Sequence, residues 1–106
     1  MELKDTGIIT VDKNAKQKIK CKKFFCKTID RHLMVHESVE NKNISSVSDS
    51  ITGYRLFNIE HKINLVTPEM IKEKLKNFVK HFTVEGIAEE FKRIENLPQD
   101  NGKKRK

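Results

Sequence analysis

The sequence predicts an α+β fold in which an antiparallel β-sheet of about four to five strands, over residues 8–66, is followed by two C-terminal amphipathic helices packed on one face of the sheet. Short β-branched segments separated by glycine, asparagine and aspartate fill the first part of the chain, which is typical of strands and turns. From Thr67 onward the apolar residues recur with the period of a helix. Because the pattern changes only once, strands and helices are expected to form separate layers.

The length and composition indicate one domain. A chain of 106 residues can bury a modest core, and we expect a compact unit over residues 1–98 followed by a disordered basic tail over residues 99–106. No apolar run approaches the roughly 18 residues of a membrane span, and the N-terminus lacks the basic and apolar regions of a signal peptide. We therefore expect no membrane association and a cytoplasmic location.

One strand is predicted in the first quarter of the chain, followed by a stretch of alternating lysines with a strand-type pattern. Residues 7–11 form a short β-branched segment bounded by a glycine and an aspartate. In residues 13–23, lysines alternate with other side chains. The four alternating lysines that would share one face of a strand are Lys16, Lys18, Lys20 and Lys22.

Two further pairs of strands are predicted between this region and the helices. Residues 24–29 and 32–39 have strand-type patterns on either side of a short turn. Residues 44–48 and 54–59 are predicted to form a hairpin, with Gly53 in the left-handed position that closes longer hairpin loops. Asp49 falls in the five-residue connection and is expected to lie at the loop tip with Ser50 and Thr52.

The two helices are predicted from matching capping signals. Thr67 is a good N-cap and Pro68 suits the first helical position, so the first helix is expected over residues 67–82. Thr83 is expected to cap a second helix at once, and with almost no loop the helices should meet at a large angle. The residues expected in the core, together with Leu56 or Phe57, are Ile71, Leu75, Phe78, Phe82, Ile87 and Phe91.

Two cysteines and two histidines have a spacing that resembles a zinc site only in part. Cys21, Cys26, His32 and His36 follow the pattern C-x4-C-x5-H-x3-H, whose central gap is much shorter than that of a zinc finger. The two cysteines are also an odd number of residues apart, so on one strand they would point to opposite faces. We expect no bound metal, no other cofactor and reduced thiols.

Positive charge is concentrated at the two ends of the chain. Residues 1–28 carry 8 basic and 3 acidic side chains, whereas residues 29–99 carry 10 and 11. A localised basic patch with aromatic neighbours is typical of nucleic-acid binding. The candidate binding residues on this interpretation are Lys16, Lys18, Lys20, Lys22, Lys23, Phe25, Lys103, Lys104, Arg105 and Lys106. The alternative interpretation is that the alternating lysines protect a sheet edge from pairing with another sheet.

The sequence favours a small non-enzymatic binding module over an enzyme. We expect a protein-binding adaptor or inhibitor that docks through an exposed strand edge or through the helix pair, of the kind that phages and mobile elements often encode. The alternative is a nucleic-acid-associated protein that uses the basic N-terminal strip and the tail. Catalysis is the least favoured hypothesis, because no set of nucleophile, base and orienting group can be traced around His32 or His36.

Overall fold

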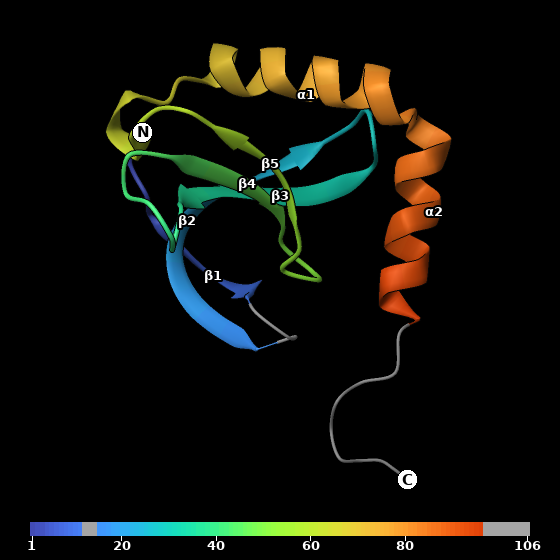
Figure 1. Ribbon diagram of the computed structural model, residues 1–106, viewed down its shortest axis with the longest axis horizontal. Coiled ribbons are helices and arrows are strands. Elements are labelled where there is room, and N and C mark those ends of the chain that lie inside the picture. The colour runs from blue at the N-terminus through green and yellow to red at the C-terminus, as the bar shows by residue number, and fades with distance from the viewer. Residues whose placement is uncertain (12–14, 97–106) are drawn as a thin grey trace, which may run out of the picture.

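The computed structural model describes residues 1–11 and 15–96, and it confirms the predicted α+β fold with its antiparallel sheet and two C-terminal helices (Figure 1). The strands are β1 (Asp5–Thr10), β2 (Lys16–Cys26), β3 (Arg31–Glu37), β4 (Ser45–Asp49) and β5 (Arg55–Ile59). The 3-10 helix η2 (Ile63–Leu65) leads into the helices α1 (Pro68–Phe82) and α2 (Val84–Glu95).

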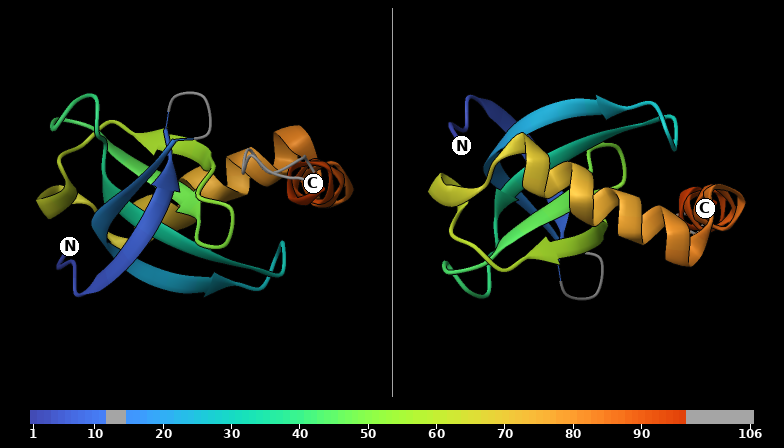
Figure 2. Two further views of the ribbon diagram at one scale, coloured as in Figure 1. Left: turned by 90° about the horizontal axis from the view of Figure 1, so that it is seen from below. Right: turned by 90° about the horizontal axis from the view of Figure 1, so that it is seen from above.

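The five strands form one antiparallel meander in the order β1-β2-β3-β4-β5. β2 is the longest strand, with 11 residues, and it changes partner along its length. Its first half, Lys16–Cys21, pairs with β1, and its second half, Lys22–Cys26, pairs with β3. β2 therefore curves away from the rest of the sheet and carries β1 beneath it (Figures 1 and 2).

Alternating side chains place two hydrophobic clusters on opposite faces of this curved sheet. The face toward the helices holds the larger cluster, which contains Leu33, Val35, Val47, Ile59, Ile71, Ile87 and Phe91. The concave face holds a smaller cluster of Ile9, Cys21 and Met34. Cys26 belongs to the helix-side cluster, so the prediction that the two thiols point to opposite faces is confirmed.

The helix caps form as predicted, but the end of the first helix is less buried than expected. Thr67 Oγ1 accepts a hydrogen bond from the Met70 N–H at 3.2 Å, and Thr83 Oγ1 accepts one from the Gly86 N–H at 3.0 Å. α2 turns sharply away from α1 at Thr83 (Figure 1). Phe82 is 51% exposed, so its assignment to the core was wrong; α1 ends there, beyond the main apolar cluster.

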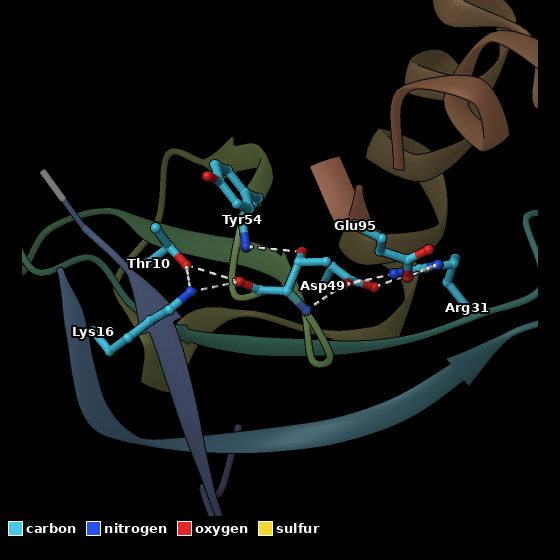
Figure 3. Close-up of polar contacts among 7 residues, drawn as sticks. Thr10, Lys16, Arg31, Asp49, Tyr54 and Glu95 are labelled. Atoms are coloured by element: carbon cyan, nitrogen blue, oxygen red, sulfur yellow. Dashed lines mark hydrogen bonds and ion pairs between the residues drawn. The ribbon is translucent and has the colours of Figure 1, made fainter. Parts of the chain in front are cut away.

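Asp49 also differs from its prediction, because it closes β4 inside the protein instead of lying at a loop tip. Its carboxylate is fully buried and accepts hydrogen bonds from Arg31 Nε at 2.9 Å and Arg31 Nη2 at 2.8 Å. Arg31 also binds Glu95 of α2 at 2.9 Å (Figure 3). The Arg31 guanidinium lies 4.3 Å from the centre of the Phe91 ring. This network fixes the position of α2 against the ends of β3 and β4.

A second set of contacts joins β1 to the turn between β4 and β5. The Thr10 N–H donates to the Gly53 carbonyl at 2.9 Å, and Thr10 Oγ1 donates to the Thr52 carbonyl at 2.7 Å. Lys16 Nζ donates to Thr10 Oγ1 at 2.6 Å (Figure 3). Gly53 has a φ of +79°, as predicted for the residue that closes this loop. These bonds draw the two outer strands together and keep the sheet curved.

Candidate functional site

The change of partner along β2 leaves one edge of its second half open. β1 pairs with β2 only as far as the partners Asp5 and Cys21, while β3 pairs with Lys22–Cys26. No described strand lies on the other side of that second half. In Figure 2, right, this part of β2 runs along the border of the sheet, beside α1.

The hydrogen bonds of β1 and β2 show which backbone groups face this open edge. The Lys23 N–H donates to Asp5 Oδ2 at 2.8 Å, so it points toward the β1 side of the strand. Peptide groups alternate between the two edges of a strand, and the N–H and C=O of Phe25 therefore point the same way as those of Lys23. Phe25 presents a donor and an acceptor at the position where an added strand would pair.

A groove of about 320 Å³ lies between the second half of β2 and the first turns of α1. The half-buried side chains of Met1, Phe24 and Leu75 and the buried side chains of Cys26 and Ile71 contribute to its apolar lining. Three exposed lysines also line the groove: Lys22, Lys27 and Lys72. None of the described residues that line the groove is acidic. The groove is therefore apolar inside and positively charged around its border.

The structure divides the predicted basic strip between two faces of β2. Lys18, Lys20 and Lys22 are exposed and share the helix-side face with Phe24. Lys23 pairs with Met34 of the concave cluster and Phe25 with His32, so their side chains lie on the opposite face. The Phe25 ring packs against the His32 ring, with 4.9 Å between the ring centres.

The remaining candidate binding residues do not extend this strip. Lys16 is exposed, but its ammonium group binds Thr10 and the Thr52 carbonyl, which gives it a structural contact. The tail residues Lys103–Lys106 lie outside the described residues. The interpretation of the alternating lysines as guards of a sheet edge is wrong for Lys16, Lys18 and Lys20, because they lie in the half of β2 that pairs with β1. Lys22 lies in the second half, which has the open edge.

A second cavity of about 480 Å³ lies on the concave face of the sheet, and buried polar groups line it. His36 is 3% exposed, and its Nδ1 lies 2.9 Å from the Glu37 carbonyl oxygen, which can only accept. Nδ1 therefore carries the proton, and Nε2 accepts a hydrogen bond from Ser48 Oγ at 2.8 Å. Burial lowers the pKa of His36, which favours this neutral form.

The His36–Ser48 pair resembles a base and a nucleophile in its geometry, and sequence reasoning did not identify it. His36 pairs with Ser46 in the β3–β4 register, so Ser48, two residues further along β4, is its diagonal neighbour on the same face. This diagonal relation was the signal that could have identified the pair. Ser48 is only 1% exposed, and the group that orients the imidazole is a backbone carbonyl and not a carboxylate. We therefore assign this pair a structural role in the concave face.

The buried imidazole makes a specific pH dependence of stability expected. Because the pKa of His36 is lowered below its ordinary value of 6.5 on folding, the unfolded chain binds this proton more readily. The stabilisation is present above pH 6.5 and is lost as the pH falls through the lower pKa of the folded protein. Urea unfolding of the wild type and His36→Gln at about pH 7.5 and about pH 5 measures this effect. The wild type should lose more stability than the variant over this interval; equal losses would contradict the assignment.

Neither a metal site nor a membrane span is present in the part of the chain that the structure describes. Within residues 1–11 and 15–96, no three side chains of histidine, cysteine, aspartate or glutamate come together as metal ligands. Cys21 and Cys26 are both free and buried, on opposite faces of the sheet. Neither described helix is long and apolar enough to cross a bilayer. Comparisons with protein-family models, with curated proteins and with solved structures find no match to this chain.

Proposed function

We propose that this protein is a non-enzymatic protein-binding module, an adaptor or inhibitor, that receives an extended segment of its partner as an additional strand along the second half of β2. The observation that carries the proposal is the open edge at Phe25, beside the apolar groove of α1. In strand addition, backbone hydrogen bonds provide much of the affinity and adjacent pockets select alternate side chains. Both parts are present here, in neighbouring positions.

The helix pair supports docking less well than this edge. Ile71, Ile87 and Phe91 are buried in the core, which uses most of the apolar faces of α1 and α2. At the joint between the helices, Phe82 and Val84 are the large apolar side chains with more than a third of their surface exposed. The joint has no open backbone edge, because its peptide groups belong to helices.

Nucleic-acid binding remains the alternative function, and the arrangement of side chains favours it less. A single-stranded nucleic acid needs aromatic rings and basic side chains on one surface. Phe25 lies on the face opposite Lys18, Lys20 and Lys22, and Lys23 is the only lysine of β2 that shares its face. Phe24 is half-buried under α1.

The two free cysteines are compatible with a reducing compartment, so we place the proposed module in the cytoplasm.

Proline at position 25 tests the proposal. Phe25→Pro removes one N–H of the open edge, and a proline is tolerated where that N–H has no partner strand. We select binders from a displayed library of random unstructured peptides and measure their affinity for the wild type and the variants. Loss of one backbone bond and obstruction of the edge should weaken binding by about tenfold or more.

Phe25→Val is the matched control, because it removes the ring and keeps the N–H. It should bind the selected peptides within a few-fold of the wild type, and thermal unfolding should show that both variants fold. Equal affinity for Phe25→Pro and the wild type would refute docking at this edge. Failure to select any peptide would refute the function as a whole.

A further inference from the structure

We propose that the groove beside β2 selects an acidic partner segment, in which apolar residues alternate along an extended strand and aspartate or glutamate residues flank them. This inference rests on the proposed function, because it specifies what the open edge of β2 receives. It concerns a part of the surface whose charge, lining and backbone groups all restrict the chemistry of the occupant.

The charge of the groove is the first restriction. Lys22 comes from β2, Lys27 from the turn that follows it, and Lys72 from α1, so the positive charge surrounds the groove from both sides. None of the three lysines forms an ion pair with a carboxylate of the described residues. The carboxylate of Asp5 is directed at the Lys23 N–H instead. Three exposed ammonium groups are therefore available to an acidic ligand.

The shape of the groove is the second restriction. Side chains of an added strand alternate between two faces, so every second one would point toward the helix side. There it would meet Phe24 and Leu75, which are half-buried, and Ile71, which is 7% exposed. The second half of β2 pairs with β3 through five residues, Lys22–Cys26, which sets the length of the segment that can be received. The ligand is a short apolar strand with acidic flanks.

A nucleic acid satisfies only the charge. It can neutralise the lysines, but it has no alternating N–H and C=O groups to pair with Phe25, and its sugar-phosphate backbone does not fill an apolar groove. An acidic peptide can contact the lysines, the open edge and the apolar lining together. We therefore propose a peptide, and not a nucleic acid, as the ligand of the groove.

Synthetic peptides of one design test the inference. Three peptides share an alternating valine and isoleucine core, and their flanking residues are all glutamate, all glutamine or all lysine; a short oligothymidylate is the fourth ligand. Binding is measured by titration at low and at physiological salt, with ligand up to roughly 1 mM, the weak end of specific binding. We expect the acidic peptide to bind most tightly and the basic peptide most weakly, with a difference that decreases as salt increases.

The variants locate the effect. Lys72→Gln should reduce the affinity for the acidic peptide by about two- to fivefold and leave the neutral peptide unchanged, since an exposed ion pair is weak. Lys92→Gln is the matched control: it removes the same charge from exposed α2, outside the groove, and should change neither affinity. Phe25→Pro should weaken both the acidic and the neutral peptide.

The outcomes separate this inference from the proposed function. Equal binding of the acidic and neutral peptides, lost in Phe25→Pro, would overturn the acidic selectivity and leave strand addition standing. Oligothymidylate that displaces the acidic peptide and depends on Lys72 would overturn the inference in favour of nucleic acid. If none of the three peptides binds, both the inference and the module are refuted.

Discussion

Replacing Asp49 with alanine is expected to destabilise the protein by roughly 3–5 kcal/mol, because it leaves a desolvated guanidinium without its main partner. The Asp49 side chain is 0% exposed and that of Arg31 is 15% exposed. Hydrogen bonds from Arg31 and from the Thr52 N–H both end on this carboxylate, the latter at 2.7 Å. In the wild type the hydrogen bond to Asp49 raises the pKa of Arg31. In the variant the guanidinium stays charged because its intrinsic pKa is too high for deprotonation, so Arg31 cannot escape the penalty by losing its proton.

Urea denaturation of Asp49→Ala measures this loss, and Glu95→Gln is its control. Glu95 binds the same arginine, but its side chain is 41% exposed, so we expect its substitution to cost less than about 1 kcal/mol. A much larger loss of unfolding free energy in Asp49→Ala than in Glu95→Gln would show that the buried contact between Arg31 and Asp49 provides most of the stabilisation. Similar values for both would contradict the assigned role of Asp49.

Replacing Gly53 with alanine is expected to have the second-largest effect, since it disturbs the junction between β1 and the β4–β5 turn. A φ of +79° is unfavourable for any residue with a β-carbon, which by itself costs about 1–3 kcal/mol. The new β-carbon would also lie 2.7 Å from Thr10 N and 2.9 Å from Ile8 O, both of them backbone atoms of β1. β1 would have to move, and the hydrogen bond from Thr10 to Gly53 would be strained or lost.

Thermal unfolding of Gly53→Ala compared with Gly86→Ala tests this account of the junction. Gly86 lies in α2, where a β-carbon would approach only Thr83 Oγ1, at 3.1 Å, and where alanine is a better helix former. We expect a change within about 1 kcal/mol for Gly86→Ala and a clearly larger loss for Gly53→Ala. An unchanged midpoint for Gly53→Ala would mean that β1 is not held by this turn.

Much of the fold could be predicted because local signals agree with the final structure. The change from strand pattern to helical period at Thr67 corresponds to the start of α1, and the caps at Thr67 and Thr83 both form. Helical periodicity assigned Phe82 to the apolar stripe of α1, but it could not show that this end of the helix extends beyond the apolar core. Phe82 is therefore exposed to solvent. Nor could periodicity show that Asp49 and Arg31 are brought together, because that depends on the register between β3 and β4.

The candidate site could be predicted only in part. Strand alternation correctly separated Cys21 from Cys26 and placed Lys18, Lys20 and Lys22 on one face. The open edge was not predictable, because it exists where β1 begins at Asp5, opposite Cys21, while β2 continues to Cys26. No pattern within the sequence of β2 indicates where its pairing with β1 stops. Strand alternation within β2 also places Phe25 on the face opposite Lys18, Lys20 and Lys22.

Amide hydrogen exchange at Phe25 tests the central claim most directly. In the free protein the Phe25 N–H should exchange rapidly, because no strand within residues 1–11 and 15–96 pairs with it, whereas the Phe24 N–H faces β3 and should be protected. Saturation with the acidic peptide should slow exchange at Phe25 by about tenfold or more and leave Phe24 nearly unchanged. Protection of Phe25 equal to that of Phe24 in the free protein, or no slowing at Phe25 in the complex, would contradict strand addition at this edge.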